Sequence, residues 1–266
     1  MARHERPHEP SVAILLKVTR MDVPGRESSA EQSRIADLLG IIGGQGQRML
    51  DAGTRDGYLA KRLVDRFDEI IALDLQRPAF EHEKITTVAG NITQLDFPAG
   101  HFDLVLCAEV LEHLSGNDLA SACRELARVC SKQLVIGVPF HQDLRFGRTT
   151  CGNCGRENPA WAHISSFDLA KLKSLFAGLT VHKVSYVGAH HARTNWLSTR
   201  LLSLAGNPYG PYRQLEPCIH CDAQLRAPTT RNFAQRVMSK MAMLIQQAQD
   251  VCTPPQAKWL HIDFRK

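Results

Sequence analysis

Residues 48–63, Arg-Met-Leu-Asp-Ala-Gly-Thr-Arg-Asp-Gly-Tyr-Leu-Ala-Lys-Arg-Leu, constrain the fold more than any other stretch of this chain. They predict a buried strand, an acidic, glycine-bearing turn from Asp51 to Gly57, and then an amphipathic helix. Glycine allows a sharp turn or a close approach of the backbone to a ligand, and a helix N-terminus presents free N–H groups. We therefore predict that this strand–turn–helix unit holds a small molecule against its backbone.

Continuous apolar runs alternate with helical patterns along the rest of the chain. Such alternation is typical of parallel strands that helices cover on both faces. We predict an α/β Rossmann-like, doubly wound sheet of seven mostly parallel strands with an antiparallel last strand. The expected helices are 29–42, 57–67, 117–129, 166–177, 194–205 and 231–249, and the expected strands are 47–52, 69–74, 84–89, 101–108, 133–138, 179–187 and 258–264.

The charge and hydropathy of the chain favour a globular protein without a strong electrostatic preference. Its 266 residues carry 32 basic and 27 acidic side chains, a formal charge of +5, which permits an anionic partner without arguing for one. No apolar run approaches the roughly 20 residues of a membrane span, and the short run at 11–17 follows a polar start unlike that of a signal peptide. We expect a cytoplasmic protein, and the sequence leaves its oligomeric state open.

Four of the eight cysteines form two Cys-x-x-Cys turns, Cys151 with Cys154 and Cys218 with Cys221. Two such turns can supply the four thiolates of a tetrahedral structural Zn²⁺ site. A pair of disulfides is the alternative that a reducing cytosol disfavours, and an iron–sulfur cluster is another. We expect a zinc-knuckle insertion made of residues 148–163 and 205–228. The Rossmann-like domain then comprises 29–147, 164–204 and 229–266, after a lead-in of 1–28.

The ligand of the glycine turn is constrained by two acids. Asp74 ends the second expected strand about 20 residues beyond the turn, where a carboxylate can accept from both hydroxyls of a ribose. The turn lacks the Gly-x-Gly-x-x-Gly pattern of dinucleotide sites, and Asp51 would repel a pyrophosphate. A nucleoside ligand with a cationic or amine-bearing end would instead favour Asp51.

Four motifs together resemble those of the class I S-adenosylmethionine-dependent methyltransferases. They are Asp51-x-Gly53-x-x-x-Gly57, Leu73-Asp74, Gly90-Asn91 and the segment 102–113, which ends in Glu-Val-Leu-Glu-His. The resemblance covers about residues 45–188, is closest to the branch with Val-Leu-Glu-His after strand four, and includes the segment His163-Ile-Ser-Ser-Phe-Asp-Leu169. It implies that the methionine portion lies against the turn, that Asp74 binds the ribose, that Leu75 packs on the adenine, and that Asn91 and Ile92 lie at the adenine edge. The turn residues implied are Asp51, Gly53, Thr54 and Gly57. Asn91 departs from the usual acid, and Arg55, which replaces a usual glycine, has no role that the sequence assigns.

The candidate catalytic residues follow strands four and five, where the acceptor pocket of such a fold is expected. They are Glu109, Glu112, His113 and His141, with Phe140 beside them. We predict His141 as the general base. If residues 109–113 begin a helix, Glu109 and Glu112 or His113 share one face and, with His141, can hold a Mg²⁺-class ion that binds a substrate oxygen. That arrangement resembles metal-dependent O-methyltransferases. The alternative is that the segment only orients its loop by hydrogen bonds.

The expected activity is S-adenosylmethionine-dependent O-methylation of a small-molecule or glycan-like acceptor. In the family that the chain resembles, insertions usually build the acceptor lid, so the zinc insertion is expected to shape specificity. The first alternative keeps the chemistry and makes RNA the acceptor, by analogy with zinc-bearing RNA methyltransferases. The second is a non-catalytic, zinc-stabilised partner subunit with a methyltransferase-like fold. The acceptor and the atom methylated stay open at this point.

Overall fold

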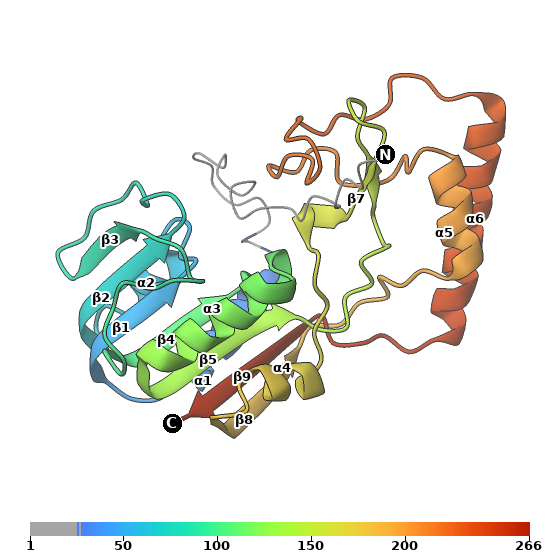
Figure 1. Ribbon diagram of the computed structural model, residues 1–266. Coiled ribbons are helices and arrows are strands. Elements are labelled where there is room, and N and C mark those ends of the chain that lie inside the picture. Colours follow the sequence, from blue (N-terminus) through green and yellow to red (C-terminus); the bar gives the residue numbers. More distant parts are fainter. Residues whose placement is uncertain (1–25, 27) are drawn as a thin grey trace, which may run out of the picture. The chain divides into compact units, whose positions relative to one another are not determined.

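The computed structural model describes residue 26 and residues 28–266 (Figure 1). The expected lead-in, with its apolar run at 11–17, lies almost entirely outside the described residues. The described residues divide into two compact units. The sheet unit comprises residues 26, 28–143, 163–193 and 250–266, and the cysteine unit comprises residues 144–162 and 194–249.

Seven strands of the sheet unit form one sheet in the order β3-β2-β1-β4-β5-β9-β8. The first five are parallel, and β9 is antiparallel to both β5 and β8. This confirms the predicted fold class. From β1 the next strands along the chain, β2 and β3, lie on one side, whereas from β4 the next strand, β5, lies on the other side. The carboxyl ends of β1 and β4 therefore flank the position where such sheets bind ligands. The strands are β1 Gly46–Ala52, β2 Phe67–Asp74, β3 Ile85–Ala89, β4 Phe102–Ala108, β5 Cys130–Pro139, β8 Thr180–Val187 and β9 Trp259–Arg265.

Helices cover both faces of this sheet. Successive residues of a strand point to opposite faces, and β1 shows the consequence. Met49 packs in a core cluster that includes residues of α1 (Ser29–Ile41) and α2 (Tyr58–Arg62). Leu50 packs in a second cluster with residues of α3 (Gly116–Val129) and α4 (Leu169–Leu175). The continuous apolar runs therefore reflect strands buried on both sides.

The helices differ from their predicted bounds at one or both ends, and two cases have a clear local reason. The helix expected over 57–67 ends after Arg62, because the N–H of Leu63 bonds to the carbonyl of Ala60 and a turn then leads into β2 at residue 67. The helix expected from 166 starts three residues later, because the side chain of Asp168 caps it by accepting from the N–H of Lys171. Both differences arise from hydrogen bonds at a helix end, which the spacing of apolar residues does not predict.

The cysteine unit contains a small hairpin and two helices. The hairpin pairs β6 (Thr149–Thr150) with β7 (Glu157–Asn158), and the helices are α5 (Trp196–Leu204) and α6 (Phe233–Cys252), whose last three residues fall in the sheet unit. The predicted boundaries place both helices in the Rossmann-like domain. The compact units divide the chain differently. Helical spacing predicts a buried face but not the unit against which that face packs. No helix among the described residues has the length and apolarity needed to cross a membrane.

Candidate functional site

The carboxyl end of β1 places a buried carboxylate near the centre of the sheet. Asp51 is 4% exposed, and the hydroxyl of Thr54 donates to its Oδ2 over 2.6 Å. Burial raises the pKa of Asp51 to about 6, although the hydrogen bond from Thr54 acts in the opposite direction. A buried carboxylate of this kind is stabilised by a cationic group placed against it.

The geometry of the turn requires glycine at both positions 53 and 57. Gly53 has φ +81°, and a Cβ there would lie 2.2 Å from Cγ2 of Val110. Gly57 has φ +73°, and a Cβ there would lie 2.2 Å from Cζ of Phe80. A side chain at either position meets both an unfavourable backbone conformation and a steric overlap. The contact with Val110 also brings the segment after β4 directly against the turn.

Asp74, at the end of β2, is bound to the same turn. Its Oδ2 accepts from the N–H of Arg55 over 2.8 Å, and its Oδ1 accepts from the N–H of Leu75 over 2.7 Å. Burial raises the pKa of Asp74, and these two backbone hydrogen bonds oppose the rise. Arg55 has φ 57°, a conformation that costs a residue other than glycine about 1 kcal/mol. The sequence assigns Arg55 no role, and in the structure its backbone N–H helps to fix the Asp74 carboxylate.

The residues expected at the adenine edge lie just beyond β3. The side-chain oxygen of Asn91 accepts from the N–H of Thr93 over 2.9 Å, which fixes its orientation by a local turn. Ile92 is buried in the core cluster of the sheet, and Leu75 is partly exposed. The structure therefore places Leu75 at the surface of the strand ends and makes Ile92 mainly a core residue.

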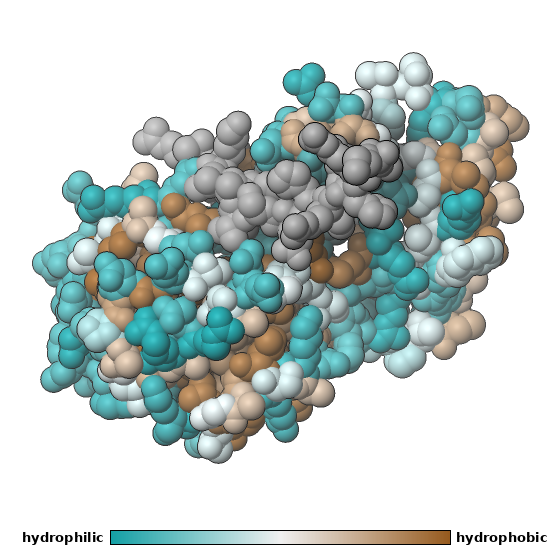
Figure 2. Space-filling model, viewed as in Figure 1, coloured by the Kyte–Doolittle hydropathy of each residue, from teal (hydrophilic) through white to brown (hydrophobic). Residues whose placement is uncertain are grey.

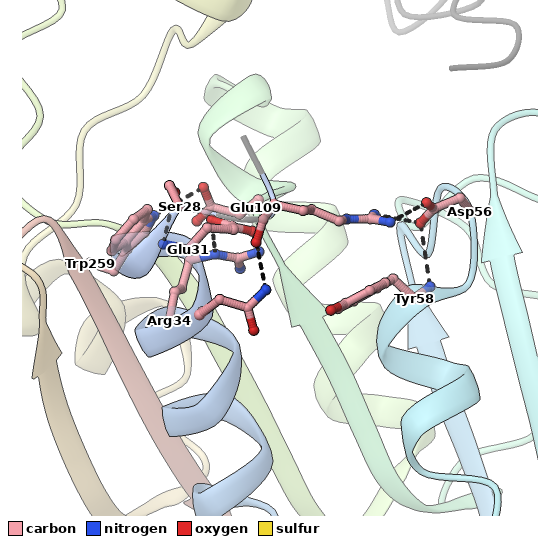
Figure 3. Close-up of polar contacts among 9 residues, drawn as sticks. Ser28, Glu31, Arg34, Asp56, Tyr58, Glu109 and Trp259 are labelled. Carbon is pink, nitrogen blue, oxygen red and sulfur yellow. Dashed lines mark hydrogen bonds and ion pairs between the residues drawn. The ribbon is translucent and has the colours of Figure 1, made fainter. Parts of the chain in front are cut away.

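Glu109 follows β4 directly and is held in the left-handed backbone region. Its φ is 58°, and its N–H donates to the carbonyl of Gly137 over 2.9 Å. The indole N–H of Trp259 donates to Glu109 Oε2 over 3.2 Å, while Glu31 binds the guanidinium of Arg34 (Figure 3). Burial raises the pKa of Glu109, and the positive charge of Arg34 opposes this. No pattern in the sequence indicates Trp259 as a partner of this acid.

Glu112 lies in a short 3-10 turn, Leu111–His113, and is fully buried. Neither oxygen of its carboxylate has a hydrogen-bond partner among the described residues. Oε1 lies 4.0 Å from Nε2 of His163, and the rings of His113 and His163 meet edge to face with centroids 4.8 Å apart. One donor atom from each of the three side chains lies within 4.8 Å of the others. Burial, with the charge of Glu109 second, raises the pKa of Glu112 well above its usual range.

The structure brings His163 to this cluster instead of His141 and Glu109. The N–H groups of Ile164 and Ser165 donate to the carbonyl of Glu112, which holds the loop of His163 against it. His141 is exposed and packs on Phe140, with ring centroids 4.3 Å apart. Of the predicted metal set, the structure therefore brings together Glu112 and His113, but not Glu109 or His141.

The local backbone explains why Glu109 lies apart from this cluster. A shared helical face requires a helix from residue 109, but the turn begins at 111 and Glu109 precedes it with a positive φ. The carboxylate of Glu109 therefore turns to Trp259. The signal for His163 was present in the segment 163–169, which resembles the methyltransferase pattern.

The four cysteines of the two Cys-x-x-Cys turns meet in the cysteine unit. Their sulfur atoms lie within 4.8 Å of one another, and the pairs Cys151–Cys221 and Cys154–Cys218 are each 3.7 Å apart. Zinc–sulfur bonds of 2.3 Å in a tetrahedron separate the sulfurs by about 3.8 Å. The donor set therefore fits a tetrahedral Zn²⁺ ion, and the four thiols form no disulfide.

The two turns of this cluster share one backbone design and are tied together. The residue after each second cysteine has a positive φ, 71° at Gly155 and 57° at Asp222. The side-chain oxygen of Asn158, in β7, accepts from the N–H of Ile219 over 2.9 Å. Nε2 of His220 lies 3.1 Å from the carbonyl oxygen of Glu157. These contacts explain how cysteines more than 60 residues apart meet.

Comparison with known proteins identifies the same part of the chain. Residues 50–135 match a family model described as "Methyltransferase domain". A stretch of 109 residues is 30% identical to a Mycobacterium tuberculosis H37Rv protein named as a probable S-adenosylmethionine-dependent methyltransferase, covering 38% of this chain and 39% of that protein. The chain thus spans about two fifths of the length of this curated relative.

Solved structures show the same fold over most of the chain. The N-methyltransferase NodS of Bradyrhizobium japonicum WM9 superposes with a TM-score of 0.52 at 14% identity, covering 91% of this chain and 98% of NodS. The [4+2]-cyclase SpnF also superposes with a TM-score of 0.52, at 13% identity, covering 90% of this chain and 83% of SpnF. Fold alone therefore does not fix the reaction. The family match and the strand order nevertheless agree: residues 50–135 match the methyltransferase domain model and lie in a sheet that shares the fold of NodS.

Proposed function

We propose that this chain is an S-adenosylmethionine-dependent methyltransferase that methylates an oxygen of a small-molecule or glycan-like acceptor. One observation carries the first part of the proposal: the turn after β1 brings a buried carboxylate, two crowded glycines and the fixed carboxylate of Asp74 to one strand edge. Asp51 is placed to bind the amino group of the methionine portion, and Asp74 to accept from the ribose hydroxyls. The named M. tuberculosis relative supports the same cofactor.

The transfer needs a base or a cation beside the acceptor. The acceptor oxygen attacks the methyl carbon, the carbon–sulfur bond breaks with its electron pair moving to sulfur, and the acceptor hydroxyl loses its proton. We assign the proton to the cluster of Glu112, His113 and His163, since these groups lie within 4.8 Å of one another, rather than to the exposed His141. A divalent cation bound there would polarise the acceptor hydroxyl. The buried Glu112 carboxylate, which accepts no hydrogen bond from the described residues, fits such an ion.

The cysteine cluster is proposed as a closed structural Zn²⁺ site. Four thiolates leave no open coordination position, so the ion would stabilise the cysteine unit rather than enter the reaction. We expect a cytoplasmic location, where thiols stay reduced and available to a metal ion. In this proposal the cysteine unit shapes the choice of acceptor.

The proposal is tested by methyl transfer from S-adenosylmethionine carrying a labelled methyl group. Hydroxylated small molecules, oligosaccharides and RNA are offered in parallel, with Asp74→Ala as the variant that loses the ribose contact. Label in a hydroxylated small molecule or glycan, reduced at least about tenfold in the variant, supports the proposal. Label in RNA supports the RNA alternative. Absence of both transfer and cofactor binding would point to a non-catalytic partner subunit.

A further inference from the structure

Helix α6 exposes apolar side chains, while its most buried positions are small or polar. Its buried positions include the hydroxyl residue Ser239, fully buried like its neighbour Ala242. Ser239 accepts from Arg231 and donates to the carbonyl of Arg236, and the side chain of Asn195 donates to Gln249 over 2.8 Å. The most buried positions of α6 are thus small or polar, and Met238 and Ile245 are partly buried beside them.

The opposite face of α6 is apolar and exposed. Val237, Met241 and Leu244 are 40%, 49% and 56% exposed, and Ala248 is also exposed. Figure 2 shows apolar residues gathered along this helix. The spacing alternates between four and three residues, which is the seam of a helix that pairs with another helix. We call Ala234, Val237, Met241, Leu244, Ala248 and Val251 the α6 seam.

The α6 seam is complementary to itself when two copies run antiparallel. With the two-fold axis between residues 242 and 243, Val237 faces Ala248 of the second copy, and Met241 faces Leu244. Ala234 faces Val251 at the ends. Each small residue meets a larger one, so the layers can interdigitate, and one patch serves both partners as a two-fold interface requires.

The charges of α6 fit the same arrangement. Arg236 and Lys240 lie in its N-terminal half, whereas residues 241–252 contain no Lys or Arg and one acid, Asp250. Antiparallel pairing places the basic half of each helix beside the half without bases. Parallel pairing would place the basic halves together, which costs free energy.

We propose that the chain forms a homodimer through antiparallel pairing of the two α6 seams. The seam extends over the 20 residues of α6, or about 30 Å. A lipid surface is the competing occupant, but the exposed face presents two alanines in the seam and Lys240 and Gln247 beside it, which offer little apolar volume to a bilayer. A second copy is the occupant that the small-to-large pattern fits.

The first test is the mass of the full chain by light scattering after size exclusion. We expect the mass of two chains, each 29.6 kDa. Met241→Glu places two carboxylates in the seam and should raise the dimer dissociation constant at least about a hundredfold. Met243→Glu makes the same change on the same helix at an exposed position outside the seam and should leave the dimer intact. Circular dichroism confirms that both variants fold.

The second test fixes the orientation by oxidative cross-linking, with Cys252→Ser in every sample. Val237→Cys with Ala248→Cys should cross-link two chains, and each single substitution should not. Within one helix these positions are about 16 Å apart, so no bond can close inside a chain. A monomeric wild type, a dimer that survives Met241→Glu, or cross-linking by Val237→Cys alone would overturn the proposal. So would flotation of a monomer with anionic phosphatidylglycerol vesicles.

Discussion

Cofactor binding should weaken as the pH falls through about 6, because the amino group of the cofactor must be met by an ionised Asp51. Burial raises the pKa of this group to about 6 from the ordinary 3.8. Below pH 6 the ligand-free protein therefore keeps a proton on Asp51, and that proton must leave when an ammonium group binds. Because binding lowers the pKa of Asp51, the bound state is favoured above pH 6 and loses that advantage as the pH falls.

The size of the effect follows from the two pKa values. If the bound ammonium returns Asp51 to its ordinary pKa, the affinity at pH 5 is lower than at pH 7 by roughly tenfold. The fall should begin near pH 6 and level off near pH 4. At pH 7 the α-amino group of the cofactor remains largely protonated, so its own titration does not contribute.

The assay is calorimetric titration of S-adenosylhomocysteine, the demethylated product, into wild type and Asp51→Asn between pH 5 and 7. The amide keeps the shape of the side chain and removes its ionisation. We expect weaker binding at pH 7 and a nearly flat pH profile for the variant. A fall of equal size in Asp51→Asn would refute the assignment, and Asp74→Asn then tests whether the other acid of the site is responsible.

Three further outcomes are expected. Gly53→Ala should weaken cofactor binding at least about tenfold, whereas Gly44→Ala, with a similar positive φ but no atom within 4 Å of the added Cβ, should destabilise the fold slightly and leave binding unchanged; calorimetry and thermal melting separate the two effects. Metal analysis should find one zinc per chain, lost with a lowered melting temperature in Cys151→Ser but retained in Cys252→Ser; a metal-free wild type would contradict the zinc proposal. Glu112→Gln should reduce kcat at least about a hundredfold with little change in cofactor affinity, and an unchanged kcat would remove Glu112 from the chemistry.

The sheet could be predicted because its central strands, such as β4 and β5, contain continuous apolar runs that end in turn residues. The glycine turn and Asp74 could be predicted because their chemistry is local in sequence. The hydrogen bond from Arg55 to Asp74 could not, since it depends on the backbone N–H of a residue in an unusual conformation. An arginine at position 55 suggests a role for its side chain, but it is the backbone N–H of Arg55 that contacts Asp74.

The cluster of Glu112, His113 and His163 shows where spacing arguments fail. Spacing predicted that Glu109 and Glu112 share a helical face, but a positive φ before a three-residue turn separates them. His163 joins Glu112 through loop hydrogen bonds across about 50 positions of sequence. The grouping of α5 and α6 with the cysteine turns is likewise a tertiary result, because helical periodicity identifies faces without naming their partners.

The central claim is that the turn between β1 and α2, together with Asp74, binds S-adenosylmethionine. It is tested most directly by titrating S-adenosylhomocysteine into the full chain and into Asp74→Ala at pH 7. The account predicts one site per chain in the wild type and binding at least about tenfold weaker in the variant, with unchanged melting temperatures of the ligand-free proteins. Absence of binding to the folded wild type, or equal affinity in the variant, would contradict it.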